Sequence, residues 1–401
     1  MAIDAHYVRD VPDNVPLDRI VDFDLYNPIV DGLDIHHSLK NLQDSAPYSV
    51  VWTPHNGGHW IATRGRLIAQ VYFSSHTVLL PKETVGAAYR FFPLSLDPPV
   101  HRPYRNLLNQ NLLAKAVRPI EDKVRRLTVE LIEGFRPAGQ CNFAHDFAEK
   151  LPLRVFMELV DLPLADLPKL KYLADQFTRP DGTIEVSEVT RMFHAYLAPI
   201  IAERRGKGGH DMLSRMIDGK VYDRVVTDEE ASNLAVQVLV GGLDTVVNFM
   251  SFAMLHLARD AELRHMLAAD TALIPDAIAE LLRRFPLVSS SREVREDMEF
   301  EGVTLRKGDM ILGPTLLHGL DDAENADPFA VKVHRAAPRH SSFGKGDHTC
   351  PGQHLARVEL RILLEEWLKR IPDFAVAPGT ELTYTGGAVC AVSPYVLEWD
   401  V

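Results

Sequence analysis

The longest apolar stretch of the chain lies at residues 228–259. Apolar side chains fill most positions from 234 to 255, and Thr227 precedes Glu230 by three residues, the spacing of a helix capping box. A helix that is apolar on all sides is typical of a protein interior. We therefore predict one buried helix over 228–259, on the order of 48 Å long at 1.5 Å per residue.

Four small or polar residues interrupt this stretch near its middle. Gly241, Asp244, Thr245 and Asn248 follow the i, i+3, i+4, i+7 spacing that places residues on one face of a helix. Buried polar groups need hydrogen-bond partners or a function. The face is therefore either a notch for helix packing, with its side chains satisfied internally, or the wall of a ligand site.

The rest of the pattern is mostly helical. A β-hairpin is predicted over 48–65, where apolar runs flank Asn56-Gly57-Gly58. Short strands are predicted near 298–304, 309–313 and 383–398. Further helices are predicted over 64–73, 99–112, 119–135, 145–160, 164–177, 187–205, 275–284 and 351–370. The expected fold class is mainly α with small β-sheets, an α+β arrangement.

Composition and charge exclude several classes of protein. The 401 residues are 46% apolar and carry a net charge of −12, which disfavours nucleic-acid binding as the main function. Cys141, Cys350 and Cys390 are too few and too widely spaced for a disulfide framework, and they fit a reducing cytoplasm. Gln237 and Asp244 lie within the apolar stretch, so we expect no membrane span there. The N-terminus shows no apolar run of the signal-peptide kind.

Residues 343–356, FGKGDHTCPGQHLA, surround Cys350 with glycines and place a helical pattern directly behind it. A zinc site would need more ligands at short spacing, and His348 and His354 form an unusual set with one cysteine. A catalytic thiol would need a base and an oxyanion site, which the stretch does not show. A thiolate bound axially to haem iron needs one cysteine on a glycine loop at a helix N-terminus, where free N–H groups stabilise negative charge. The layout matches this third possibility.

Pro351, directly after the cysteine, has no N–H to donate. We expect the thiolate to receive one hydrogen bond fewer than it would beside another residue. Alternatively, proline suits the first turn of the following helix, where that N–H would go unused.

Phe343, Gly346, Cys350 and Gly352 match the pattern Phe-x-x-Gly-x-x-x-Cys-x-Gly, and the chain thereby resembles the cytochrome P-450 monooxygenases. The resemblance implies a haem b cofactor with the Cys350 thiolate as its iron ligand. It also implies a single domain over 1–401 with the cytochrome P-450 fold, a triangular, helix-rich prism whose long central helix lies over the haem.

Other segments extend the resemblance over essentially the whole chain. Glu280 and Arg283, with Arg335, resemble the family's Glu-x-x-Arg network, for which we expect a structural role. GGLDT (241–245) resembles the family's oxygen-binding kink with its acid–alcohol pair, and DPPVHRPYR (97–105) resembles a haem-contacting helix. Within the bacterial members, the camphor-hydroxylating branch is similar in VGGLDTVVNF, LKYLADQFTRPDG, GQCNFAHDFAE, GQHLAR and EWLKRIPDF.

The resemblance also implies roles for individual residues. Asp244 is expected to relay protons, and Thr245 to hydrogen-bond dioxygen or a neighbouring water. Lys171 and Arg179 are expected to pair with Asp244 in one state of the substrate channel and to release it in another. Contacts to the haem, including cationic partners for its propionates, fall on His101, Arg105, Gly241, Arg292, Phe343, His348, Cys350 and Gly352.

The matched substrate pocket differs from that of the camphor-hydroxylating branch. Tyr89 matches a tyrosine that bonds the ketone, but one extra residue between Pro81 and Tyr89 puts the direction of this side chain in doubt. Leu94 and Gln237 replace residues of different polarity, so we expect a cyclic terpenoid other than camphor, a monoterpenoid or norisoprenoid ketone. The expected substrate residues are Leu79, Tyr89, Leu94, Thr178, Gln237, Val240, Val288, Ala388 and Val389.

The sequence contains no flavin or pyridine-nucleotide motif, so electrons from NAD(P)H must arrive through another protein. The resemblance implies a two-iron two-sulfur ferredoxin, fed by a ferredoxin reductase, that docks at Arg102, Arg105 and Arg357. These features predict a monooxygenase that uses O2. Two alternatives stay open, a haem-thiolate peroxygenase driven by hydrogen peroxide and a haem- or terpenoid-binding protein without turnover.

Overall fold

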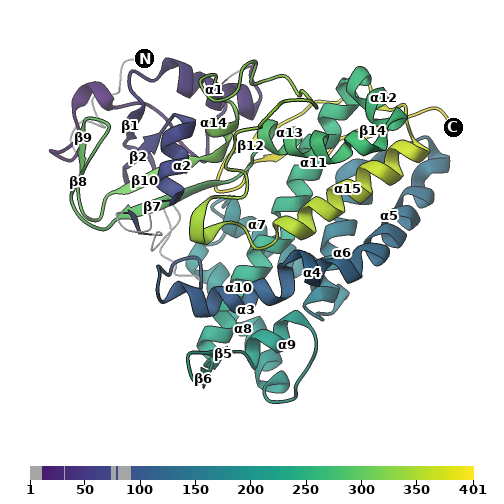
Figure 1. Ribbon diagram of the computed structural model, residues 1–401, viewed down its shortest axis with the longest axis horizontal. Helices are drawn as coiled ribbons and strands as arrows, with labels where there is room; N and C mark the ends of the chain where they lie inside the picture. The colour runs from purple at the N-terminus through teal and green to yellow at the C-terminus, as the bar shows by residue number, and fades with distance from the viewer. Residues whose placement is uncertain (1–10, 31, 74–77, 80–91) are drawn as a thin grey trace.

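The computed structural model describes residues 11–30, 32–73, 78–79 and 92–401. Its outline is roughly triangular, with the β-rich part at the upper left of Figure 1 and helices across the right and the bottom. The predicted α+β class is confirmed. The helices are α1 Ile35–Ser45, α2 Gly65–Phe73, α3 His101–Leu112, α4 Ala114–Val117, α5 Glu121–Phe135, α6 Lys150–Leu159, α7 Leu167–Thr178, α8 Val186–Arg204, α9 Met212–Ile217, α10 Asp228–Leu243, α11 Thr245–Arg259, α12 Ala261–Ala269, α13 Ile274–Arg284, α14 Thr315–Gly319 and α15 Gln353–Arg370.

The largest sheet has the strand order β1-β2-β10-β7-β3. Its hairpin of β1 Val50–Thr53 and β2 His59–Ala62 is antiparallel, as predicted for 48–65. β10 Met310–Pro314 then pairs parallel to β2 and antiparallel to β7 Ser289–Val294. The other strands are β3 Val78–Leu79, β4 Gln140–Asn142, β5 Lys220–Val221, β6 Arg224–Val225, β8 Met298–Phe300, β9 Val303–Leu305, β11 Ala375–Val376, β12 Tyr384–Thr385, β13 Ala391–Val392 and β14 Val396–Glu398.

The predicted central helix is present, but it is broken at Asp244. This residue separates α10 from α11 and has φ −129° and ψ −45°, outside the helical range. The Thr245 hydroxyl donates to the carbonyl oxygen of Gly241 at 3.0 Å, and the Asn248 amide donates to the carbonyl oxygen of Asp244 at 3.0 Å. Side chains that bond backbone carbonyls in this way compete with the helical ladder and bend a helix.

The start of the central helix is as predicted. Thr227 accepts from the N–H of Glu230 while the Glu230 carboxylate accepts from the N–H of Thr227, which completes the capping box. By length and composition, the helix at Asp228–Arg259 could cross a membrane, but 78% of its most apolar window is buried within the fold. Its apolar side chains therefore belong to the protein core.

Glu280 and Arg283 on α13 form a buried cluster with Arg335, which we call the Glu280 cluster. Glu280 Oε1 lies 2.8 Å from Arg283 Nε and 2.9 Å from Arg335 Nε. The Arg283 guanidinium also donates to the carbonyl oxygens of Gly319, Pro328 and Ala330. The cluster joins α13 to α14 and to the long loop before Cys350, which is the structural role expected from the sequence.

Candidate active site

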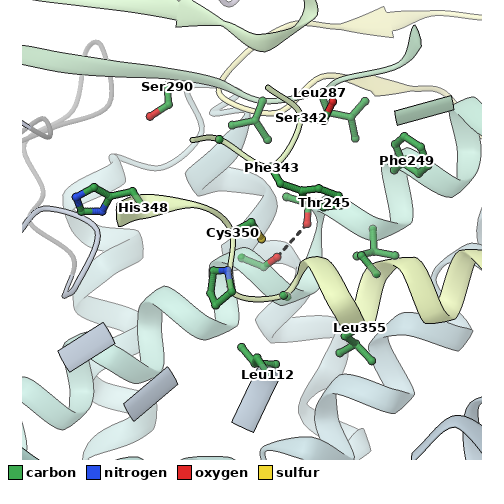
Figure 2. Close-up of a pocket in the computed structure, with 18 of the residues that line it drawn as sticks. Leu112, Thr245, Phe249, Leu287, Ser290, Ser342, Phe343, His348, Cys350 and Leu355 are labelled. Atoms are coloured by element: carbon green, nitrogen blue, oxygen red, sulfur yellow. Dashed lines mark hydrogen bonds between the residues drawn. The ribbon is translucent and has the colours of Figure 1, made fainter. Parts of the chain in front are cut away.

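A cavity of about 340 Å³ opens between the bend in the central helix and the cysteine loop. Figure 2 shows Thr245, Phe249, Leu287, Phe343, Cys350 and Leu355 among its lining side chains. Its walls come from helices α3, α6, α10, α11 and α15, from β7 and the residues just before it, and from the loop at 342–352. Segments far apart in the sequence, and among them most of the predicted site motifs, therefore meet at one place.

The cysteine loop is held in a tight backbone arrangement. The N–H of Cys350 donates to the carbonyl oxygen of Phe343 at 2.7 Å. Gly344 and Gly346 adopt φ of 68° and 67°, in the left-handed region that favours glycine. The guanidinium of Arg357, on α15, lies 4.5 Å from the centre of the Phe343 ring. These contacts fix the loop ahead of α15 and direct the Cys350 side chain into the cavity.

Protein groups alone do not favour the Cys350 thiolate. Burial raises the pKa of the Cys350 thiol, and this effect exceeds the opposing effects of the Gly352 and Gln353 N–H groups and of the Arg105 charge. The N–H groups at the start of α15 stabilise negative charge on the sulfur, as expected, but burial opposes it more strongly. A metal cation bound at this sulfur would favour the thiolate, because a coordinating thiol is deprotonated.

Arg105, Arg292 and His348 line the cavity, and His101 lies behind His348 without lining it; we call these four residues the basic end. The His101 and His348 rings lie 4.1 Å apart between centres. All four of their nitrogens are buried and have no hydrogen-bond partner among the described residues. Burial, followed by neighbouring positive charge, lowers the pKa of His101 to about 4 and that of His348 to about 2.

Among the described residues, no carboxylate forms a hydrogen bond or an ion pair with the guanidinium of Arg292. Its guanidinium, 3% exposed, donates to Ser290 Oγ at 3.1 Å and to the carbonyl oxygen of Ser291 at 2.9 Å. Burial lowers the pKa of Arg292 to about 10. A buried arginine held only by neutral acceptors favours an anionic ligand, because an unpaired buried charge is costly.

Gly241 and Gly242 play different parts on the central helix. A Cβ added at Gly241 would meet no atom within 4 Å, so the backbone there faces open space. A Cβ at Gly242 would lie 2.4 Å from the Phe156 ring, so this glycine permits the packing of α6. Only Gly241 therefore leaves room for a flat group to approach the helix.

Asp244 and Thr245 are adjacent in sequence but point into different surroundings. Thr245 lines the cavity, whereas Asp244 is fully buried and is not among the lining residues. The Asp244 carboxylate accepts from both terminal nitrogens of Arg179 at 2.7 Å, and Lys171 Nζ lies 3.6 Å away. The predicted pairing of Asp244 is present.

Neighbouring positive charge decides the protonation state of the Asp244 carboxylate. Burial opposes ionisation of Asp244, but the hydrogen bonds and charge of Arg179, with the charge of Lys171, prevail and lower its pKa. Burial, with the charge of Asp244, raises the pKa of the neighbouring Asp175 to about 6, against Lys171 and Arg179. A carboxylate that titrates near neutrality therefore lies beside the Asp244 ion pair.

The predicted substrate residues divide into three groups. Leu94, Gln237 and Val288 line the cavity, as expected. Thr178, Val240, Ala388 and Val389 are not among the lining residues, and their contact with substrate stays a prediction. The Thr178 hydroxyl donates to Asp244, and the backbones of Ala388 and Val389 bond Thr178 and Arg179. Tyr89 lies outside the described residues, and of Leu79 only the backbone, in β3, is described.

The predicted docking arginines are not equivalent. Arg102 is exposed, but Arg105 donates to the carbonyl oxygen of Thr349 and to Asn109 Oδ1. Arg357 lies on the Phe343 ring and donates to Gln353 Oε1 at 3.1 Å. Arg105 and Arg357 thus hold the cysteine loop in place, and neither is a freely extended surface cation.

Glu359 on α15 is a cavity residue that the sequence analysis missed. Its side chain lines the cavity, it is 1% exposed, and burial raises its pKa to about 8. The segment ARVELRILLEEW contains three glutamates, and nothing in the pattern marks Glu359 as a residue that lines a cavity. Only the packing of α15 against the cavity places it there.

These residues fit a haem. The cavity presents one thiol, a glycine backbone facing open space, and a basic end with unpartnered ring nitrogens that suit two carboxylate groups. The family model described as cytochrome P450 matches residues 166–381. The chain belongs to the cytochrome P450 family, whose members are haem-thiolate monooxygenases with haem b.

Within the family, the chain is a bacterial member close to the CYP101 group, as the sequence indicated. It is 56% identical to the crystal structure of CYP101J2, with a TM-score of 0.88, covering 98% of this chain and 100% of that one. The crystal structure of CYP101C1 is 39% identical over 98% of this chain and 100% of that one, also with a TM-score of 0.88. A curated relative, probable cytochrome P450 127A1 of Sinorhizobium fredii, is 31% identical over 97% of both chains.

Proposed function

We propose that this monooxygenase hydroxylates a cyclic terpenoid, a monoterpenoid or norisoprenoid ketone, with O2 and with electrons from NAD(P)H delivered by a two-iron two-sulfur ferredoxin. The observation that carries the proposal is the shared cavity of Cys350 and Thr245, which is otherwise lined mainly by apolar side chains. We further propose that 1–401 acts as one domain in the cytoplasm.

Haem, when bound, supplies the activation of O2, and Cys350 is its proposed iron ligand. His101, Arg105, Arg292 and His348 would hold the propionates, and Gly241, Phe343 and Gly352 would line the haem site. A thiolate ligand donates electron density that favours cleavage of an O–O bond. The protein thus fixes the reactive centre from one side and leaves the central helix side for substrate.

Proton delivery is assigned to Thr245 and Asp244. The Thr245 hydroxyl lies in the cavity wall and donates to the carbonyl oxygen of Gly241 at 3.0 Å. Asp244 is buried and ion-paired, so it exchanges protons only when Arg179 and Lys171 withdraw. Thr245 therefore holds a proton at the site, and the opening of the Asp244 ion pair replenishes it.

The substrate class rests on the shape and polarity of the cavity and on the resemblance to the camphor-hydroxylating branch. Leu94, Val288 and Leu287 present apolar surface, and the polar Gln237 stands among them. An oxygenated cyclic hydrocarbon suits such a lining. For the ferredoxin, the exposed Arg102 is the cation proposed to make direct contact, while Arg105 and Arg357 support the loop beneath it.

The electron source is tested by comparing two assays of the purified holoenzyme with one terpenoid ketone. Product should form with ferredoxin, reductase and NADH, and much less with hydrogen peroxide alone. Efficient turnover with peroxide alone would instead indicate a peroxygenase. Substrate binding without product in either assay would indicate a binding protein.

Thr245→Ala tests the proton-delivery assignment. The variant loses one hydroxyl and should bind haem and substrate as before. NADH consumption should continue, while the product formed per NADH falls about tenfold or more and hydrogen peroxide accumulates, because general acid–base groups contribute 10²–10⁴-fold to rates. An unchanged ratio of product to NADH would remove Thr245 from the mechanism.

A further inference from the structure

Gln237 introduces an amide into the wall of the cavity from the middle of α10. Its Oε1 atom is buried and has no hydrogen-bond partner among the described residues. Two other polar side chains that line the cavity are satisfied internally: the Tyr72 hydroxyl donates to the carbonyl oxygen of Gly313, and the Thr315 hydroxyl to that of Val288. Gln237 therefore offers hydrogen-bonding capacity that the protein itself does not use.

The unpartnered Oε1 atom of Gln237 lowers the stability of the folded protein without ligand. A buried polar atom without a partner loses its hydrogen bond to water and gains none in return. The amide could have been replaced by an apolar residue of the same length, as the neighbouring lining positions Val238 and Leu94 are apolar. A ligand that supplies the missing hydrogen bond removes this cost.

The position of Gln237 also sets a distance. Gln237, Gly241 and Thr245 all line the cavity and follow one another at intervals of four residues on the central helix. At 1.5 Å per residue within α10, Gln237 stands about 6 Å from the level of Gly241. Thr245 lies beyond Gly241, on the far side of the break at Asp244. A group bonded to Gln237 is thus held well away from the part of the cavity that Thr245 and Cys350 share.

We propose that Gln237 anchors the substrate by a hydrogen bond to its oxygen function and thereby directs oxidation to a carbon at the opposite end of the molecule. The amide can present its Oε1 acceptor to a hydroxyl or, after turning, its Nε2 donor to a carbonyl. The inference rests on the proposed terpenoid hydroxylation and adds that Gln237 holds the oxygen function of the substrate. That oxygen lies about 6 Å or more from the carbon that reacts.

The test is a binding comparison on the ferric holoenzyme, read from the shift of the Soret band. The probes are β-ionone, its alcohol β-ionol, and the hydrocarbon megastigma-5,7-diene, which share a carbon skeleton and differ in the oxygen function. The protein should bind the two oxygenated probes about tenfold more tightly than the hydrocarbon. In Gln237→Met, which keeps the length of the side chain without its amide, this ratio should fall to about one.

A matched control separates the hydrogen bond from the shape of the cavity. Val288→Ala enlarges the same cavity without changing its polarity, so it should alter the three affinities by similar factors. The carbon monoxide band of the reduced protein confirms that each variant retains its haem site. In product analysis, Gln237→Met should convert one main hydroxylation position into a mixture.

Each outcome of these experiments bears on one part of the proposal. A ratio that is unchanged in Gln237→Met, or a ratio near one in the unsubstituted protein, would overturn the anchor. Retention of one product position in Gln237→Met would overturn its orienting role. If none of the three probes shifts the Soret band, the proposed terpenoid class fails and the anchor fails with it, an outcome distinct from the loss of the ratio alone.

Discussion

The Glu280 cluster and the basic end of the cavity are both buried and both charged, but the protein satisfies only one of them. In the Glu280 cluster, every Arg283 nitrogen donates to a carboxylate or carbonyl oxygen. At the basic end, the rings of His101 and His348 have no partner among the described residues, and Arg292 has only neutral acceptors. A charged cluster that is complete in itself holds elements together, and one that lacks acceptors is built for a ligand.

The same contrast separates two neighbours on the central helix. The Asp244 carboxylate accepts hydrogen bonds from Arg179, Thr178 and Asn248, so its demand for donors is met. Thr245 makes one hydrogen bond, to a backbone carbonyl, and keeps its hydroxyl in the cavity wall. Asp244 must therefore lose a contact before it can act, whereas Thr245 is already in place.

Replacement of the thiol should have the largest effect. Cys350→Ser removes the proposed iron ligand and should abolish the red-shifted Soret band of the reduced protein under carbon monoxide. Cys390→Ser is the matched control, because Cys390 is 1% exposed and is not among the cavity-lining residues. The control should keep the band. A band that survives in Cys350→Ser would show that the iron ligand is another residue.

Disruption of the satisfied cluster should cost stability. Glu280→Gln leaves Arg283 and Arg335 without their buried carboxylate, and breaking a buried ion pair costs about 3–5 kcal/mol. The urea midpoint of the variant should fall accordingly. Glu365→Gln, in the partly exposed network of α5 and α15, should lower the midpoint far less. Equal losses in the two variants would deny the Glu280 cluster its structural role.

The sequence predicted the elements that carry long-range periodicity or a specific motif. The helix from 228 and its capping box, the hairpin at 48–65, and the Cys350 loop were all placed correctly. It missed α1 and α12, although the side chains of Asp34 and Asp260 cap their N-termini in the way that such residues commonly do. The hydrophobic pattern did not show the break at Asp244, since a bend caused by two side chains that bond carbonyl oxygens leaves that pattern unchanged. Only the family resemblance implied a kink at 241–245.

The candidate site was predictable where residues act through chemistry and unpredictable where packing decides. Cys350 and His348 follow from a motif. Glu359 lines the cavity because of how α15 packs, and Thr178 lies outside the cavity wall because of how α7 packs. Which face of a helix meets a cavity is set by tertiary contacts between distant segments, and these have no local signature.

A buried histidine outside the cavity, His59, should make the stability of the fold depend on pH. Both ring nitrogens of His59 are buried without a partner among the described residues, and burial lowers the pKa of His59 to about 4. The unfolded chain protonates near pH 6.5, so the stability that His59 contributes is complete above that pH and is lost as the pH falls toward 4. Wild-type stability should therefore fall by about 1.4 kcal/mol more per pH unit than that of His59→Gln between those values. Parallel pH profiles of urea unfolding would contradict this.

The smallest effect is expected at Pro351. Two N–H groups, those of Gly352 and Gln353, favour the Cys350 thiolate, and proline has no N–H to add. Pro351 precedes Gly352, the N-cap of α15, so it does not occupy the first helical position where a missing N–H would go unused. The first-turn explanation therefore does not apply directly, and an electronic role, in which hydrogen bonds around a metal ligand tune the metal, stays a prediction.

Pro351→Leu should restore a third donor to the sulfur. A hydrogen bond to a charged group is worth about 1.5–3 kcal/mol, part of which acts on the difference between oxidation states. The thiolate of the variant should donate less electron density, so the haem reduction potential and the C–O stretching frequency of the reduced carbon monoxide complex should both rise. Leu355→Met, further along α15 in the same cavity wall, changes packing without adding a donor and should leave the frequency in place. If the frequency of Pro351→Leu also stays in place while the haem band is intact, Pro351 does not tune the iron, and its role is confined to the path of the backbone into α15.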